Sequence, residues 1–491
     1  MRTFFIHVGA GRVHLLAELR RLGLEVVFFT TNDAPKPEVY AEMAPGVPFI
    51  TNAHAQSGRS PLLGPPPPAR LEDIQGIAAS EQVALHCFDR SNAAGRSMIE
   101  LHSLYLEHVG RWRAILSRYD PEVLVFSDNP HHGWDNVLYA LARLDGRKTA
   151  IIGYTELERR VIVKSRIHEA PGPTAEEVDQ AVASARAVAE VSRDANNLRS
   201  NQRTNDLRRI RWKTSLLGAA RLMVGLKQFQ RTPPMGLFFL GDETPRYIKV
   251  RWTLFQNRLV GRQLFQAWQS LARNVSVAEP FVYLPLPMQP ESTTVPLAGE
   301  YSDQLTLTRV VAEALPQGWK LYVKEHPAQL VWNLASRGRT VDYYRRLAQI
   351  PRVSLISLEV NGGYLAGKAR AVATATGTTG FEAIEAGVPA VVFSTPWYAK
   401  APGVIQVRTV EQCRDALGKI QRGEATVDRD RLRVFKHLMA ERYTVEAIFD
   451  SETALANDKA PVATAARLAK AIRQVIDRQT AGGPVEDRLK A

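Results

Sequence analysis

Short apolar runs and amphipathic segments alternate along most of the chain. Thr3–Val8 is an apolar run of strand length, and His14–Leu22 follows with leucines at helical spacing. Leu24–Thr31 is a second apolar run, rich in Val and Phe. This order of strand, helix and strand is typical of parallel sheets that are covered by helices on both faces. The opening of the chain therefore predicts an α/β domain.

The alternation continues to about residue 165. A long helical stretch at about Ile74–Tyr119 leads to an expected strand at Val123–Ser127. A helix at Asn136–Leu144 and a strand at Lys148–Gly153 follow. We therefore expect residues 1–165 to form one Rossmann-like domain.

A second set of alternating elements begins near residue 276. Strands are expected at Phe281–Leu286, Lys320–Lys324, Val353–Ile356, Ala371–Thr376 and Ala390–Ser394, with helices between them and a mostly helical region after Val410. These elements predict a second doubly wound α/β domain over residues 276–450. Residues 166–275 would be a basic helical insertion or linker, and residues 451–491 a C-terminal helix and tail.

Composition narrows the class of protein. The 491 residues are 45% hydrophobic and 23% charged, which excludes a wholly disordered or collagen-like chain. No stretch reaches the ~18 uninterrupted apolar residues that a membrane-spanning helix needs. Cys87 and Cys413 lie far apart, so neither a disulfide framework nor a cysteine metal site is indicated. We expect a cytoplasmic protein.

The positive charge is concentrated in one segment. The net charge is +13, and residues 193–273 contribute +12 of it, from 16 basic and four acidic residues. Basic and apolar residues interleave there, which fits an anionic membrane surface or a large anionic acceptor. No nucleic-acid motif accompanies them, so no nucleic-acid partner is expected. An ordinary helix pair that packs its apolar side on the second domain is the open alternative.

Ligands of open α/β sheets bind outside the carboxyl ends of the strands, so the loops there hold the candidate site residues. The turn Gly377-Thr378-Thr379-Gly380 follows one such strand and opens a helix, where hydroxyl and N–H groups can bind phosphate. Glu382, in the first turn of that helix, could reach a ribose hydroxyl. Threonines that merely cap the helix are the alternative.

The segment Lys324-Glu-His326-Pro327 ends another strand of the second domain. Lys324 and His326 could neutralise the charge that develops on a departing phosphate. The alternative is a strand-end histidine bonded to a nearby backbone carbonyl. Gln289 and Glu291 follow the first strand of the same domain and are expected to overlook a cleft, although a purely structural proline corner is equally consistent.

The first domain offers general-base candidates. His131 and Asp135 lie in the loop after the strand at Val123–Ser127. A zinc site is disfavoured because the adjacent histidines, His131 and His132, would point apart on most backbones and no cysteines are near; a solvated loop stays open. The segment with Gly11 and His14 begins like a dinucleotide fingerprint, but His14 replaces the third glycine, which disfavours a nicotinamide enzyme without excluding it. We expect both residues at the acceptor side of the cleft.

Three longer motifs resemble one family. Tyr283–Thr293, Leu321–Pro327 and Thr374–Pro389 look like the bacterial capsule and surface-polysaccharide biosynthesis family. The resemblance implies a GT-B glycosyltransferase, with two Rossmann-like domains that face a cleft and usually no catalytic metal. Relatives include transferases that use CMP-activated acidic sugars, in which a His-Pro motif contacts the nucleotide phosphate. His326-Pro327 matches that motif, and Thr378-Thr379 resembles the hydroxyl pair near the donor.

The chain departs from the family pattern in two places. Leu286-Pro287 stands where members often have Leu-His, and the first domain lacks a clear acidic acceptor motif. The base therefore stays open between Asp135 and His131.

We predict a metal-independent glycosyltransferase without a cofactor. Its substrates would be a nucleotide-activated sugar and a glycan or lipid-linked glycan acceptor, and it could bind the inner face of the cytoplasmic membrane peripherally. A glycerophosphotransferase of the teichoic-acid type and a catalytically silent assembly scaffold are the alternatives.

Overall fold

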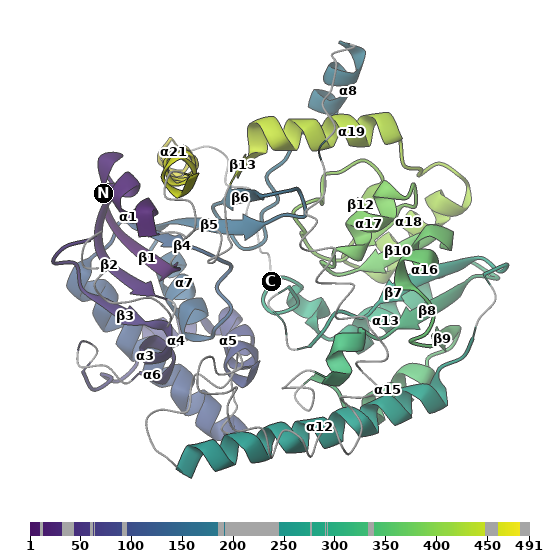
Figure 1. The fold of residues 1–491 in the computed structure, drawn as a ribbon, viewed down its shortest axis with the longest axis horizontal. Coiled ribbons are helices and arrows are strands. Elements are labelled where there is room, and N and C mark those ends of the chain that lie inside the picture. The colour runs from purple at the N-terminus through teal and green to yellow at the C-terminus, as the bar shows by residue number, and fades with distance from the viewer. Residues whose placement is uncertain are drawn as a thin grey trace. The chain divides into compact units, whose positions relative to one another are not determined.

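The computed structural model describes residues 1–9, 13–31, 44–58, 62, 64–90, 96–184, 191, 245–274, 277–289, 291, 293–331, 338–446 and 460–481 (Figure 1). The chain divides into two compact units. Unit 1 comprises Met1–Asp89, Arg96–Pro171 and Ala440–Ala491, and unit 2 comprises Arg90–Gly95 and Gly172–Met439. Unit 1 is therefore built from segments that precede and follow unit 2 in the chain.

Unit 1 contains a seven-stranded sheet in the order β13-β6-β5-β4-β1-β2-β3. Its strands are β1 (Arg2–Val8), β2 (Glu25–Thr31), β3 (Phe49–Thr51), β4 (Val123–Phe126), β5 (Lys148–Tyr154), β6 (Arg160–Lys164) and β13 (Thr444–Glu446). The strands from β3 to β5 are parallel, and β6 pairs antiparallel with both β5 and β13. The strand order reverses between β1 and β4, which is the switch point where such sheets bind ligands.

Helices cover both faces of this sheet, because successive side chains of each strand point to opposite faces. The described helices of unit 1 are α1 (Val13–Arg21), α3 (Asn52–Ser57), α4 (Leu71–Gly76), α5 (Ala78–Arg90), α6 (Met98–Tyr119), α7 (Trp134–Leu144) and α21 (Ala460–Thr480). Phe5 and Phe29 pack with α1 and α21 on one face. Phe4 and Phe28 pack against aromatic side chains of α6 on the other face.

The expectation of a single long helix at residues 74–119 is wrong. Three helices, α4, α5 and α6, occupy this region and the residues that flank it. The helix α4 ends at Gly76, and α6 begins with a capping box in which Ser97 and Glu100 each accept the backbone N–H of the other. Such a cap satisfies N–H groups that a continuous helix would bond internally, and it therefore fixes a helix start at this point.

Unit 2 contains a six-stranded sheet that is parallel throughout, in the order β12-β11-β10-β7-β8-β9. Its strands are β7 (Phe281–Pro285), β8 (Lys320–Lys324), β9 (Val353–Leu355), β10 (Ala371–Thr374), β11 (Ala390–Val392) and β12 (Val404–Gln406). The order reverses between β7 and β10, so the switch point lies there. The α/β class with two Rossmann-like sheets is confirmed.

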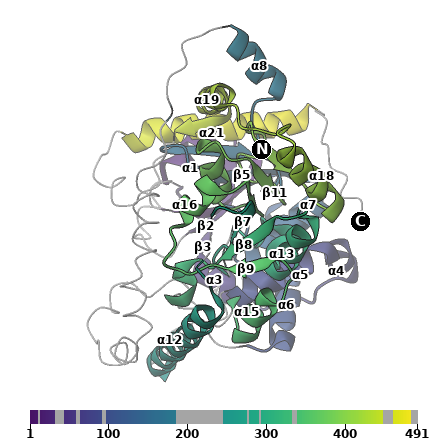
Figure 2. The same cartoon turned by 90° about the vertical axis from the view of Figure 1, so that its right-hand side faces the viewer.

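Two helical layers enclose this sheet. On one face lie α12 (Pro245–Leu271), α13 (Gln304–Ala314), α15 (Val341–Ala348) and α18 (Val410–Gln421); on the other lie α16 (Gly362–Lys368) and α17 (Thr379–Glu385). Figure 2 shows α13 and α16 on opposite sides of β7 and β8. The other helical segments of unit 2 are α8 (Ala175–Ala183), the 3-10 turns η2 (Gly299–Ser302) and η3 (Pro327–Val331), and α19 (Arg429–Leu438). The π-helical turn η4 (Met439–Tyr443) follows α19 and carries the chain from unit 2 to unit 1.

The basic segment is described only from Pro245 onwards, and its earlier part lies outside the described residues. Leu264 and Trp268 of α12 are buried in the core of unit 2, and the Trp268 indole N–H donates to the Ile356 carbonyl. This part of the basic segment therefore packs its apolar side on the second domain, which agrees with the alternative of an ordinary packed helix. Within the described ranges, no helix is both long enough and apolar enough to cross a membrane.

Candidate functional site

The predicted donor residues of unit 2 lie along one edge of its sheet. Lys324 ends β8 and His326 follows it, whereas Thr378 and Thr379 follow β10. The strand β7 lies between these two strands. Since neighbouring strands are ~4.8 Å apart, the ends of β8 and β10 are about 10 Å apart, a distance that a phosphorylated ligand can span. The structure thus gathers these residues around the switch point.

The local hydrogen bonds of His326 define which ring nitrogen carries its hydrogen. The Ala328 N–H donates to His326 Nδ1 at 3.2 Å, so the neutral ring has its hydrogen on Nε2. Burial lowers the pKa of His326, which keeps the ring neutral at pH 7. The alternative of a ring that donates to a backbone carbonyl is wrong for Nδ1, because this nitrogen accepts the hydrogen bond of a backbone N–H. His326 therefore has an N–H on Nε2 to donate.

A buried ion pair holds the Lys-Glu-His-Pro segment in place. Arg339 Nε donates to Glu325 Oε2 at 2.7 Å, and the Tyr344 hydroxyl donates to the same oxygen at 2.8 Å. The other carboxylate oxygen of Glu325 accepts the His326 N–H at 2.8 Å. The two ionic side chains are 2% and 0% exposed. Glu325 and Arg339 were not singled out from the sequence; a charged residue directly after a buried strand was the available signal.

Lys324 is a buried cation. Burial lowers the pKa of its ammonium to about 8, although the nearby Glu325 carboxylate acts in the opposite direction. Across the described part of the chain, no hydrogen bond or ion pair is made by this ammonium. A buried charge without a partner is unfavourable, so an anion at this position would stabilise it.

The Gly-Thr-Thr-Gly turn is held by side chains other than Thr378 and Thr379. The Gly377 N–H donates to Thr374 Oγ1 at 3.0 Å, and the Tyr398 hydroxyl donates to the Gly377 carbonyl. Thr378 is the N-cap residue of α17, yet its hydroxyl makes no capping bond. The reading in which Thr378 caps the helix is therefore wrong. Both threonines and Glu382 are partly exposed at this edge.

Gln289 and Glu291 have local partners in the loop after β7. The backbone N–H and carbonyl of Gln289 each make a hydrogen bond with the side-chain amide of Gln329. The side-chain amide of Gln289 donates to the Ser302 carbonyl at 3.0 Å. Glu291 accepts the Thr293 hydroxyl at 3.0 Å, and burial raises the pKa of its carboxyl group. The Gln289 amide thus stabilises this loop.

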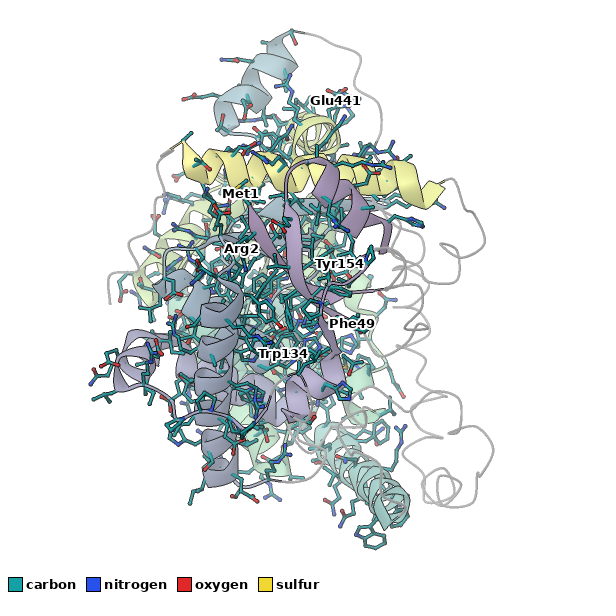
Figure 3. The ribbon with its side chains drawn as sticks, turned by 90° about the vertical axis from the view of Figure 1, so that its left-hand side faces the viewer. Met1, Arg2, Phe49, Trp134, Tyr154 and Glu441 are labelled. Atoms are coloured by element: carbon teal, nitrogen blue, oxygen red, sulfur yellow. The ribbon has the colours of Figure 1, made fainter. Side chains whose placement is uncertain are left out.

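The switch point of unit 1 holds a second polar cluster. His7 lies next to the end of β1, and its Nε2 is 2.8 Å from Oδ2 of Asp135, in the first turn of α7. His132 Nδ1 approaches the same oxygen to 3.1 Å. The backbone N–H groups of His131 and His132 donate to Asp135 at 3.2 and 2.7 Å. Trp134 (Figure 3) packs beside His7, with ring centroids 5.0 Å apart.

The Asp135 carboxyl group is fully enclosed and ionised. Burial alone would raise its pKa, but the hydrogen bonds from His132 and His7 outweigh burial and hold the pKa well below its usual range. His7 was not a candidate from the sequence, because it lies inside an apolar strand and 128 residues from its partner. A polar residue at the carboxyl end of the first buried strand was the available signal.

The expectation that His131 and His132 point apart is wrong. Their ring centroids lie 4.1 Å apart. The chain then turns at Gly133, with φ 89°, which precedes α7. His7, His132 and Asp135 offer three ligand atoms within 4.8 Å of one another, a spacing that a metal ion could use. A carboxylate has about four lone-pair sites, however, and four N–H groups already point at this one.

Gly11 and His14 are the other two acceptor-side candidates. Gly11 is outside the described residues, and His14 lies partly exposed in the first turn of α1. The Asp428-Arg-Asp430 motif starts α19, where Asp428 accepts the N–H groups of Asp430 and Arg431 as an N-cap. Both aspartates therefore belong to the start of this helix.

The fold defines an α/β protein with two Rossmann-like sheets, each with polar side chains at its switch point. Residues 293–439 match the family described as "Capsule polysaccharide biosynthesis protein". The match includes the Lys-Glu-His-Pro segment and the Gly-Thr-Thr-Gly turn, so it confirms the resemblance to the capsule polysaccharide biosynthesis family over this segment. No curated protein matches the chain.

Several solved structures align at low identity. KpsC of Thermosulfurimonas dismutans, a beta Kdo 2,7 transferase, has 10% identity and a TM-score of 0.31, over 71% of this chain and 89% of KpsC. The UDP-GlcNAc 2-epimerase of Methanocaldococcus jannaschii has 11% identity and a TM-score of 0.26, over 89% of this chain and 98% of the epimerase. The spinosyn rhamnosyltransferase SpnG has 12% identity and a TM-score of 0.25, over 90% of this chain and 96% of SpnG. These TM-scores are below 0.5, so the description of the fold rests on the strand orders of this chain.

Proposed function

We propose that the protein is a GT-B glycosyltransferase that moves a sugar from a nucleotide-activated donor to a capsule or other surface-polysaccharide acceptor. The observation that carries the proposal is the edge of the unit 2 sheet. An ammonium without a partner among the described residues, an imidazole N–H donor and two hydroxyl groups border one switch point there. The family match over residues 293–439 supports the same function.

The donor phosphates would bind between the ends of β8 and β10. Lys324 supplies a positive charge that lacks a partner among the described residues, and His326 Nε2–H donates to a phosphate oxygen. As the bond between sugar and phosphate breaks, negative charge grows on the departing phosphate, and both groups stabilise it. Thr378 and Thr379 donate their hydroxyls to the second phosphate or to the sugar, and Glu382 accepts from a ribose hydroxyl.

In this mechanism the side chains supply the charge stabilisation, and no metal or cofactor takes part. The acceptor would bind at unit 1, where a base removes its proton. A glycerophosphotransferase would use the same phosphate contacts but would transfer a phosphoryl-polyol group, so the mass of the product separates the two functions.

A thermal-shift panel with CMP, CDP, UDP, GDP, ADP and NAD tests the proposal. A nucleotide at ~100 times its dissociation constant stabilises the protein by about 2.7 kcal/mol, which is readily measured. We expect one pyrimidine or guanine nucleotide to raise the Tm, and Lys324→Met to remove this shift while Lys320→Met, on the exposed end of the same strand, retains it. A shift with NAD alone would instead indicate a dinucleotide enzyme, and no shift with any nucleotide would contradict a donor site.

A further inference from the structure

The bonds of the Asp135 cluster assign the hydrogens of two imidazoles. Asp135 is a carboxylate and can only accept hydrogen bonds. His7 Nε2 and His132 Nδ1, both within hydrogen-bond distance of Oδ2, must therefore each carry a hydrogen. A neutral imidazole has one N–H group, so the lone pairs are on His7 Nδ1 and His132 Nε2. A lone pair on an imidazole next to a carboxylate can accept a proton, because the carboxylate stabilises the resulting cation.

Exposure separates the groups that could accept a proton from a substrate. The side chains of His7 and Asp135 are 4% and 0% exposed, and His7 Nδ1 is sealed from solvent. The side chain of His132 is 20% exposed. His131 is buried, and its Nδ1 bonds to the Asn129 carbonyl instead of a carboxylate. Among these four side chains, His132 alone combines a lone pair, partial exposure and a carboxylate partner.

The backbone of His7 gives independent support for a functional cluster. His7 has φ 64°, in the left-handed region that a non-glycine residue rarely adopts. The Thr30 hydroxyl accepts its N–H at 2.8 Å, and the Ser127 hydroxyl donates to its carbonyl at 2.5 Å. Backbone strain of this kind persists where the surroundings enforce it, and it concentrates at functional sites. Here the strained residue places its ring on the carboxylate that also holds His132.

We propose that His132 is the catalytic base of the transfer and that Asp135 and His7 are its positioning residues. This inference rests on the proposed glycosyl transfer. The acceptor oxygen bonds to the anomeric carbon of the donor sugar while the bond from that carbon to the phosphate oxygen breaks, and its electron pair leaves with the phosphate. The hydroxyl proton moves to His132 Nε2, and Asp135 stabilises the imidazolium. His7 donates to the same carboxylate and so keeps it in position.

The charged and titratable groups against the His132 ring determine how the reaction responds to pH. Among the described residues they include His7 from β1, with ring centroids 4.5 Å apart, and His131 and Asp135 from its own loop and helix. Since a protonated base cannot accept the acceptor proton, kcat/KM falls on the acid side of the profile. This acid limb belongs to the coupled cluster and should change when His132 is replaced.

The experiment compares the full-length wild type with His132→Gln and Asp135→Asn, with His102→Gln as the matched control. His102 is an exposed histidine of unit 1 that pairs with Glu81 at the surface. Turnover is measured from pH 5 to 9 with UDP-N-acetylglucosamine, CMP-N-acetylneuraminate and GDP-mannose as donor probes. The Tm shift with the matching nucleotide reports on donor binding. Long-range ¹H–¹⁵N spectra report which nitrogen of His132 carries the hydrogen, and elemental analysis measures bound zinc.

We expect His132→Gln to lower kcat by roughly 10²- to 10⁴-fold, to remove the acid limb and to keep the Tm shift. Asp135→Asn should also lower kcat, and His102→Gln should stay within twofold of the wild type. The inference is overturned if His132→Gln keeps both its turnover and its acid limb, if the His132 hydrogen is on Nε2, or if one zinc per chain disappears in His132→Gln. If the wild type shifts with no nucleotide and turns over no probe, the proposed function fails, whereas the spectra still decide the state of His132.

Discussion

Replacing Arg339 with methionine should strongly destabilise unit 2. The substitution keeps most of the length of the side chain but removes the guanidinium that donates to Glu325 at 2.7 Å. It leaves a fully buried carboxylate whose remaining donors are the Tyr344 hydroxyl and the His326 N–H. Burying a charge without its hydrogen-bonded counter-charge is costly, because water does not solvate the carboxylate and the attraction of the guanidinium is lost.

The expected loss is about 3–5 kcal/mol, the range for breaking a buried ion pair by removing one partner. This loss is a large part of the ~5–15 kcal/mol that stabilises a typical domain. The double variant Glu325→Gln with Arg339→Met removes both charges and should lose less than Arg339→Met alone. The difference between the single and the double variants measures the coupling of the two side chains.

Hydrogen exchange monitored by mass spectrometry can measure the effect in each unit separately. Since each 1.36 kcal/mol is a factor of ten, the slow amides of β8 should exchange roughly 10²- to 10⁴-fold faster in Arg339→Met. Peptides from β4 in unit 1 serve as the internal control and should change little. Lys320→Met breaks an exposed pair with Glu279 at the other end of β8 and should have little effect. If Arg339→Met changes the β8 amides by less than about fivefold, the buried-pair reasoning is wrong.

Three further outcomes can be measured on the intact chain. His326→Ala should lower kcat/KM by roughly 10²- to 10³-fold if its Nε2–H stabilises the departing phosphate, and unchanged turnover would exclude that role. Because the Lys324 ammonium has a pKa of about 8 and is charged below that pH, the dissociation constant of the stabilising nucleotide should rise between pH 7 and 9; Lys324→Met should flatten this dependence, and a flat wild-type curve would contradict it. The basic segment should bind anionic vesicles at low salt and release them at high salt, and no binding at low salt would exclude a membrane role.

The alternation of apolar runs predicted the fold class well, because strands buried on both faces have an unmistakable composition. The principal strands of both sheets lie within a few residues of their expected positions. The strands β3, β6, β12 and β13 were not predicted. Three of them have only three residues, and β6 and β13 join the sheet by antiparallel pairing, which the alternation of strands and helices does not indicate. The amphipathic pattern of α21 indicated a helix, but such a pattern does not reveal which sheet the helix covers.

The candidate site was predicted where its residues follow strands directly. Lys324 ends β8, and His326 and Thr378 lie in the segments after β8 and β10, so the rule for carboxyl ends located them. The partners that orient them were not predictable, since Arg339 and His7 reach Glu325 and Asp135 only through tertiary packing. The tautomers of the imidazoles depend on hydrogen-bond directions and have no signal in the sequence.

The discontinuity of unit 1 bears on how the protein forms during synthesis. All six strands of unit 2 are complete once Gln406 has been translated, and the unit as a whole by Met439. The apolar face formed by β1, β2 and α1 has been translated by Thr31, but it is covered only when α21 supplies Leu468, Ile472 and Ile476. The nascent chain therefore carries an uncovered hydrophobic surface through most of its translation, and chaperones that bind such surfaces should protect it during this interval.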